Sequence, residues 1–152
     1  MNAIQIKNIT KRYKDVTALD DISFSFEFGR IYGFLGRNGA GKSTLINIIA
    51  NRIFADQGEV LIDGIPAKEN MGVHEKIFCM SEADLYDRDL KVKDHFKWTN
   101  RFYNDFDLDK AFELSKKFNL DTNKRFKALS KGYQSIFKLI IALSLNVPYV
   151  IF

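Results

Sequence analysis

A glycine-rich stretch at residues 36–44 has the residue types and the spacing needed to bind phosphate. It reads GRNGAGKST and fits the pattern G-x-x-x-x-G-K-[ST]. Glycines let the backbone curl so that its N–H groups point at phosphate oxygens. A helix that begins inside the motif adds the positive end of its dipole. We therefore predict a phosphate site formed by Gly36, Asn38, Gly39, Ala40, Gly41, Lys42, Ser43 and Thr44.

Three side chains of this loop have distinct predicted roles. Lys42 supplies a full positive charge for the β- and γ-phosphates, Ser43 a hydroxyl for Mg²⁺, and Thr44 support for the α/β-phosphates. The apolar run 31–35 before the loop predicts a buried strand, and residues 45–50 after it predict a helix. The alternative is a glycine-rich turn that binds nothing, and the strand–loop–helix setting argues against it.

Composition is that of an ordinary globular protein. The chain has 152 residues, of which 46% are hydrophobic and 28% charged, enough for one domain with a core. The net charge of +4 comes from mixed signs, so we expect no nucleic-acid partner. The single cysteine, Cys79, excludes an internal disulfide and fits a reducing compartment. The longest apolar stretch is far short of the ~20 residues that span a bilayer, so a cytoplasmic location is expected.

Alternation of apolar and polar residues predicts two strands in the first part of the chain, at residues 4–9 and 18–28. A turn is expected at residues 11–14 between them. Ile22, Phe24, Phe26 and Phe28 should share one face of the second strand. Further strands are predicted at 59–64 and 77–80. Together these segments predict an antiparallel layer that leads into an α/β core.

From Leu90 the spacing of apolar residues becomes helical. Helices are predicted at 94–103, 108–118 and 133–145, with Ser130 as a cap before the last of them. An apolar strand is predicted at 149–152.

Two further motifs give the chain a family resemblance. Tyr13 follows Lys11 and Arg12, and residues 129–133 read LSKGY. With the phosphate loop, they make the chain resemble the nucleotide-binding domain of an ABC transporter over essentially all 152 residues. The resemblance implies that Tyr13 stacks on adenine. It also implies that LSKGY, a variant of the family's LSGGQ signature found in ABC-2-type exporters, binds ATP held by the opposite subunit, through Leu129, Ser130, Lys131, Gly132 and Tyr133. Lys131 and Tyr133 depart from the usual letters, whereas Ser130 and Gly132 are kept.

The resemblance implies a fold and a division of the chain. The fold is an α/β P-loop NTPase of ABC type, with an antiparallel β layer, a RecA-like α/β core and a helical subdomain, incomplete at the C-terminus. Residues 1–152 are then a partial nucleotide-binding domain. The β layer and core occupy about 1–84 and 146–152, and the helical subdomain about 85–145.

The segment after the strand at 77–80 is where the sequence departs most from the family. The family places there a glutamine that senses Mg²⁺ and the attacking water. Counting from the strand puts Glu82 at that position, and counting back from Leu85 and Tyr86 puts Ser81 there. We favour Glu82 as a catalytic and Mg²⁺-binding residue, because a carboxylate can coordinate the metal or water.

The family's next catalytic groups, an Asp and a Glu that follow the strand at 149–152, are not in this sequence. The chain therefore resembles a fragment of a longer ATPase. We expect the fragment to bind nucleotide weakly or not at all and not to hydrolyse ATP, since metal positioning and general-base catalysis supply much of the rate.

The resemblance implies the ATP-binding ATPase subunit of an ABC-2-type exporter, with ATP and Mg²⁺ as cofactors. Its partners would be a membrane-spanning subunit and a second ATP-binding subunit, at the inner face of the cell membrane. The sequence looks most like Gram-positive exporters, including the phenol-soluble-modulin type. Contact with the membrane subunit is expected from Phe96, Trp98, Phe102 and Tyr103.

Two alternatives belong to other classes. One is a soluble ABC ATPase that acts on ribosomes or nucleic acid. The other is a P-loop kinase or GTPase, which the LSKGY motif and the lack of an NKxD sequence argue against.

Overall fold

The computed structural model describes residues 2–80 and 86–152. The chain forms two compact units, Met1–Ile77 and Phe78–Phe152, which are described one at a time.

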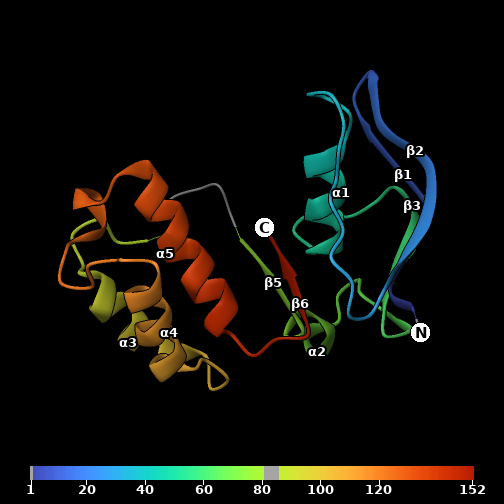
Figure 1. The fold of residues 1–152 in the computed structure, drawn as a ribbon. Coiled ribbons are helices and arrows are strands. Elements are labelled where there is room, and N and C mark those ends of the chain that lie inside the picture. The colour runs from blue at the N-terminus through green and yellow to red at the C-terminus, as the bar shows by residue number, and fades with distance from the viewer. Residues whose placement is uncertain (1, 81–85) are drawn as a thin grey trace. The chain divides into compact units, whose positions relative to one another are not determined.

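The first unit is built on a four-stranded antiparallel sheet with the order β2-β1-β3-β4. Its strands are β1 (Asn2–Tyr13), β2 (Val16–Glu27), β3 (Gln57–Ile62) and β4 (Ile65–Pro66). Helix α1 (Lys42–Ile49) lies beside this sheet, and the short helix α2 (Met71–His74) follows β4 (Figure 1). Leu45, Ile48 and Ile49 of α1 are buried. The antiparallel layer predicted from alternation is therefore confirmed.

A bulge in β1 explains how its apolar side chains all reach the core. Ile4, Ile6 and Ile9 are buried although the step from 6 to 9 breaks the two-residue period. The register shifts between Ile6 and Ile9, and Asn8 takes a positive φ of 51° there. The extra residue turns Ile9 back to the buried face.

The predicted turn at 11–14 is wrong in its start. β1 continues to Tyr13 and β2 begins at Val16, so the hairpin turns at residues 14–15, with Lys14 at φ 49°. Arg12 and Tyr13 pair with Thr17 and Val16, and these ladder contacts extend the strands beyond the point where apolar alternation stops.

The predicted strand at 31–35 is also wrong. Among the described residues, this segment belongs to none of the sheets. Its alternate rings, Tyr32 and Phe34, make edge contacts with Phe26 at 4.9 and 5.8 Å between centroids, whereas Ile31 and Leu35 are 102% and 96% exposed. An apolar run favours burial, but a strand also needs hydrogen-bonding neighbours, and in this unit the run packs only one face.

The apolar face of β2 is shorter than predicted. Ile22, Phe24 and Phe26 lie on one half-buried face, as expected. Phe28 lies beyond the end of the strand and is exposed, because the chain turns at Gly29, which has φ 73°.

The second unit is mostly helical. It contains α3 (Val92–Phe102), α4 (Leu108–Lys117), the 3₁₀ turn η1 (Phe126–Ala128) and α5 (Lys131–Ser144), close to the predicted helices. Strands β5 (Ile77–Cys79) and β6 (Tyr149–Ile151) pair with each other, which confirms both predicted strands. The helices enclose a core whose fully buried members include Val92, Phe96, Ala111, Phe126, Phe137 and Ile140.

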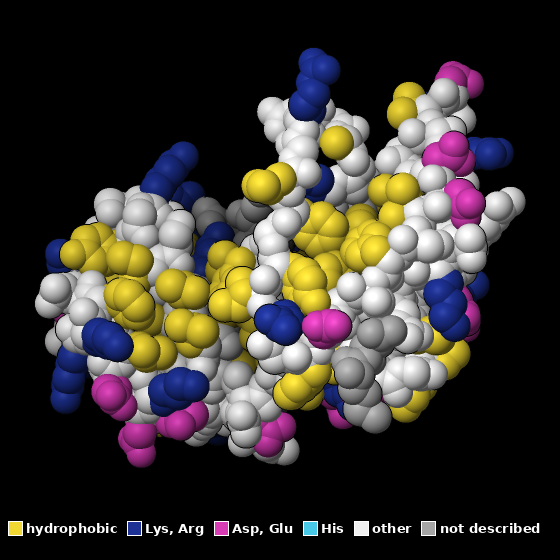
Figure 2. Space-filling view, turned by 45° about the vertical axis from the view of Figure 1, so that its right-hand side comes forward, with side chains coloured by type: hydrophobic (Ala, Val, Ile, Leu, Met, Phe, Trp, Pro, Cys, Tyr) yellow, Lys and Arg dark blue, Asp and Glu magenta, His cyan; other side chains and the backbone are white. Residues whose placement is uncertain are grey.

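Large hydrophobic side chains also reach the surface in both units (Figure 2). Within residues 2–80 and 86–152, no helix has the length and apolar character needed to cross a membrane.

Candidate functional site

The phosphate loop leads directly into α1, which begins at Lys42. Gly39 and Gly41 have φ values of 84° and 81°, a conformation that favours glycine. Gly41 is also the N-cap, and no side chain caps the helix. The N–H groups of the first turn are therefore left for another acceptor, and a helix N-terminus favours an anion.

Close packing gives a second reason for glycine at position 41. An added Cβ atom would overlap the carbonyl oxygen of Ala18 and lie 2.8 Å from Leu19 Cδ2. The end of the loop therefore rests directly on the backbone of β2. Nothing in the motif itself points to Ala18 and Leu19, which sequence reasoning missed.

Lys42 closes the loop. Its ammonium Nζ donates hydrogen bonds to the carbonyl oxygens of Gly36 and Arg37, at 2.6 and 2.8 Å. Two carbonyl dipoles thus hold the charge over the loop. A phosphate oxygen is a stronger acceptor for an ammonium than a neutral carbonyl, so the same group can turn to a nucleotide.

The other predicted residues of the loop are accessible. Residues 36–40 and Ser43 are exposed, and Thr44 is half-buried. Ala40 N donates to Arg37 O at 3.2 Å, which fixes the turn. The structure thus brings Gly36 and Lys42 together and leaves the hydroxyl-bearing Ser43 open.

Tyr13 lies at the end of β1 with 45% of its surface exposed. The Nζ atom of Lys11 lies 5.5 Å from the centre of its ring. Lys11 in turn pairs with Asp56 at 2.8 Å, and this hydrogen bond, with that from Arg12 N, lowers the pKa of the Asp56 carboxyl. The ring is therefore supported by a fixed cation and is accessible to a ligand. Lys11 and Asp56 were not identified from the sequence.

The second predicted motif begins α5. Leu129 is buried, whereas Ser130, Lys131, Gly132 and Tyr133 are exposed. Ser130 is the N-cap, and its Oγ accepts a hydrogen bond from Tyr133 N at 3.3 Å. The predicted cap is confirmed, and the buried Leu129 anchors an exposed hydroxyl and helix N-terminus.

Ser81 and Glu82 lie outside the described residues. The residue that follows this segment on the described side, Tyr86, contacts His95, Phe126 and Phe137, with ring centroids 5.7, 5.7 and 4.9 Å away. Burial raises the pKa of the Tyr86 hydroxyl to about 12. Tyr86 is therefore part of the helical core.

His95 is a packing residue of the helical core. It is buried, and a hydrogen bond of 2.9 Å joins its Nε2 to the carbonyl oxygen of Asp87. Burial lowers the pKa of the imidazole, and the bond to Asp87 partly opposes this shift. The neutral ring belongs to the aromatic cluster with Tyr86, Phe126 and Phe137.

The prediction is wrong for one of the four aromatic residues expected to contact the membrane subunit. Phe96 is fully buried in the helical core, where it stacks on Phe137 at 5.7 Å, so it cannot contact a partner. Trp98 and Phe102 are exposed and stack on each other at 5.8 Å, and Tyr103 is also exposed. Helical spacing identifies aromatic positions but does not determine which face a core covers.

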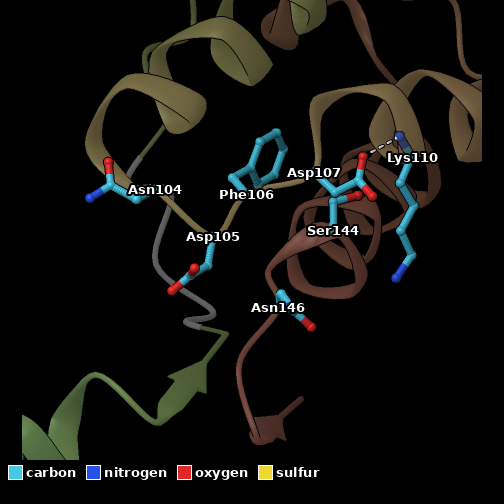
Figure 3. A pocket seen from close by; sticks show the side chains of 7 residues that line it. All are labelled: Asn104, Asp105, Phe106, Asp107, Lys110, Ser144 and Asn146. Atoms are coloured by element: carbon cyan, nitrogen blue, oxygen red, sulfur yellow. Dashed lines mark hydrogen bonds between the residues drawn. The ribbon is translucent and has the colours of Figure 1, made fainter.

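A shallow polar pocket lies at the other end of α5 from the LSKGY motif. Its volume is about 330 Å³. Figure 3 shows its lining, which comes from the loop before α4, from the first turn of α4, and from the end of α5 and the residues after it: Asn104, Asp105, Phe106, Asp107, Lys110, Ser144 and Asn146. Asp107 caps α4 by accepting a bond from Lys110 N at 2.8 Å. None of the predicted site residues lines it.

Comparison with known proteins gives these motifs a family. The sequence profile of the ABC transporter family matches residues 19–152. The chain is 31% identical over 139 residues to the ABC transporter ATP-binding protein YtrB of Bacillus subtilis (strain 168), covering 91% of this chain and 48% of YtrB. It is 32% identical over 154 residues to NatA, another ABC transporter ATP-binding protein of that organism, covering 93% of this chain and 61% of NatA.

Solved structures agree. A putative ABC transporter ATP-binding protein of Pyrococcus furiosus superposes with a TM-score of 0.84 at 27% identity, covering 97% of this chain and 74% of that chain. The dimeric cassette MJ0796, a bacterial ABC transporter cassette, superposes with a TM-score of 0.81 at 25% identity, covering 97% and 72%.

The chain therefore belongs to the ABC transporter family, and its fold is the α/β fold of the ABC ATP-binding cassette. It spans 48% of the length of YtrB and 61% of that of NatA. The predicted family and fold class are confirmed.

Proposed function

We propose that this chain is the ATP-binding part of an ATPase subunit of an ABC exporter. The observation that carries the proposal is the geometry of Lys42, whose ammonium lies over the loop on the carbonyl oxygens of Gly36 and Arg37. The charge sits beside the uncapped N-terminus of α1, where the β- and γ-phosphates of a nucleotide would be held.

Mg²⁺ would complete this site through Ser43. The exposed Ser43 is the second residue of α1, next to the uncapped N–H groups. Mg²⁺ commonly takes one or two protein oxygens together with substrate phosphates and water, so a lone hydroxyl suits it. Glu82 is the second proposed Mg²⁺ ligand and the proposed catalytic partner of Lys42, on sequence grounds alone.

Tyr13 would supply the adenine contact. Its exposed ring offers a flat face, and Lys11 holds a positive charge near that ring. Base–aromatic stacking is sequence-tolerant and is worth ~1–3 kcal/mol per base. This contact would add affinity for a nucleotide over free triphosphate.

Residues 129–133 would bind ATP carried by a second ATP-binding subunit. Ser130 presents its hydroxyl at the exposed N-terminus of α5, which suits a γ-phosphate. Two copies would then enclose two ATP molecules. The dimeric form of the related cassette MJ0796 supports this arrangement.

The exposed pair Trp98 and Phe102, together with Tyr103, would contact a membrane-spanning subunit at the cytoplasmic face of the cell membrane. Stacked aromatic residues at a surface are typical of protein interfaces. Arg101 lies 5.4 Å from the Trp98 ring and adds a cation to this patch.

Export, rather than import, is proposed from the LSKGY variant alone. The relatives include proteins named for import, such as ribose import protein RbsA 2 of Rhizobium meliloti (strain 1021), at 27% identity over 160 residues. The relatives described here carry transporter names, so a soluble ABC ATPase acting on ribosomes or nucleic acid is not favoured.

A peptide cargo of the phenol-soluble-modulin type stays a prediction. The division of the chain into a β layer and core (about 1–84 and 146–152) and a helical subdomain (about 85–145) also stays a prediction.

Titration with a fluorescent ATP analogue, with ATP, GTP and inorganic triphosphate as competitors, tests the proposal. In the complete subunit, wild type should bind ATP, and Lys42→Met should bind at least tenfold more weakly, because a charge-assisted hydrogen bond to phosphate is lost. Lys7→Ala removes an equal charge from an exposed pair with Glu59 and should bind as wild type does. Equal affinity of the Lys42→Met variant and wild type would refute the proposed site.

A further inference from the structure

Gln134 is a residue of the first turn of α5 that the family motif does not include. Its Nε2 atom lies 3.3 Å from the carbonyl oxygens of both Phe126 and Leu129, so the two amide hydrogens face one carbonyl each. Because both facing atoms are acceptors, the side chain must present its nitrogen to them. Gln134 thus ties α5 to the turn η1, which precedes Ser130.

The segment that Gln134 holds is firmly attached elsewhere. Phe126 is fully buried and Leu129 is 8% exposed. Phe126 N donates to Leu90 O at 2.9 Å, and Lys127 N donates to Arg88 O at 3.0 Å. Removing the Gln134 side chain should therefore leave the turn in place as a whole.

What the Gln134 amide does fix is the angle at which the chain enters α5. Leu129, one of its two acceptors, is the residue immediately before Ser130, and Gln134 N also donates to Ser130 O at 2.8 Å. Leu129 and Ser130 therefore form a short connection into α5. The side-chain amide of Gln134 holds the Leu129 carbonyl, and the backbone N–H of Gln134 holds the Ser130 carbonyl.

We propose that Gln134 is a positioning residue that holds Ser130 for the nucleotide of the opposite subunit. This inference rests on the function proposed above. The amide of Gln134 touches no nucleotide and acts through the backbone of Leu129 and the Ser130 cap. A displacement of about 1 Å at such a site is enough to weaken binding in the reacting complex.

Two substitutions separate positioning from folding. Gln134→Leu keeps the approximate size and loses both hydrogen bonds. Gln134→Glu keeps the shape, but its ionised carboxylate faces two carbonyl oxygens and repels them. Once protonated, the same carboxyl can donate one of the two bonds. Ser135→Ala is the matched control, because Ser135 is the next residue of the helix, is exposed, and donates from its Oγ to Lys131 O of its own helix.

The experiment measures three quantities in the complete subunit: ATP-driven dimerisation by light scattering, affinity for fluorescent ADP, and the melting temperature. Both Gln134 variants should need about tenfold more protein to dimerise at pH 8, from the loss of two hydrogen bonds. Affinity for ADP, which occupies the variant's own phosphate loop, should stay within twofold of wild type. The Gln134→Glu defect, measured against wild type at each pH, should shrink as the pH is lowered from 8 to 4.5, toward the ordinary glutamic acid pKa of about 4.3, whereas the Gln134→Leu defect should not. Ser135→Ala should match wild type throughout.

Wild-type dimerisation by Gln134→Leu would overturn the inference. A loss of dimerisation that is matched by a parallel loss of ADP affinity and of melting temperature would also overturn it, since that result describes a purely structural residue. A wild-type protein that binds no ATP would instead refute the proposed function itself.

Discussion

Gly41 touches the backbone of Ala18 so closely that a methyl group on Gly41 would overlap the Ala18 carbonyl oxygen. This contact seats the end of the phosphate loop on β2, and it makes position 41 different from the other loop glycines. Gly39 has a similar φ of 84°, but an added Cβ atom there would meet no atom within 4 Å.

The two glycines should respond differently to the same change. Gly39→Ala carries only the cost of a left-handed backbone, ~1–2 kcal/mol of unfolding free energy. Gly41→Ala adds steric overlap with Ala18 and Leu19, so we expect a loss of about 3 kcal/mol or more. Urea denaturation of both variants measures the difference. Equal losses would mean that the β2 contact contributes nothing.

Tyr13 should distinguish a nucleotide from its phosphates. Tyr13→Ala should weaken ATP binding roughly tenfold through loss of base stacking, and Tyr13→Phe should keep the affinity. Binding of inorganic triphosphate should be unchanged in both variants, because it has no base. Competition titrations against a fluorescent ATP analogue give all four values. A parallel loss for triphosphate would place Tyr13 in a role other than base stacking.

Phe96 and Trp98 lie two positions apart in α3 and have opposite environments. Phe96 is fully buried, so Phe96→Ala should cost ~3–5 kcal/mol of unfolding free energy. Trp98 is exposed, so Trp98→Ala should cost less than about 1 kcal/mol and should instead weaken association with the membrane subunit. Chemical denaturation and co-purification with the membrane subunit measure the two effects. Full association of the Trp98→Ala variant would argue against the proposed contact.

His95 should make stability depend on pH. Burial lowers its pKa in the folded state below the ordinary value of 6.5, so the unfolded chain binds the proton more readily. The stability from a neutral His95 is then fully present above pH 6.5. It decreases as the pH falls below 6.5 toward the folded-state pKa.

The His95→Phe variant isolates this contribution. Phenylalanine keeps an aromatic ring among Tyr86, Phe126 and Phe137 but cannot be protonated. We expect wild type to lose more unfolding free energy than His95→Phe between pH 7.5 and pH 5.5, measured by urea denaturation. An identical loss in both proteins would exclude His95 as a source of the pH dependence.

The sequence by itself determined the elements whose residue pattern carries local physics. The glycines of residues 36–44 predict the loop, because few other residues tolerate its backbone conformation. The helical spacing of apolar residues predicts α3, α4 and α5. The cap at Ser130 was predictable because it depends on a hydrogen bond to a residue only three positions away.

The tertiary structure alone decided the relationships between distant segments. Residues 31–35 read as a strand, yet whether an apolar run becomes a strand depends on which other segments supply hydrogen-bonding partners. Likewise, the spacing of aromatic residues along the helix could not show that Phe96 lies in the core and Trp98 at the surface. Which side of the helix is covered depends on the elements that pack against it. The contact of Gly41 with Ala18 joins residues that lie far apart in the sequence and that no local pattern relates. Such contacts depend on where the folded chain returns, and only the assembled fold fixes that.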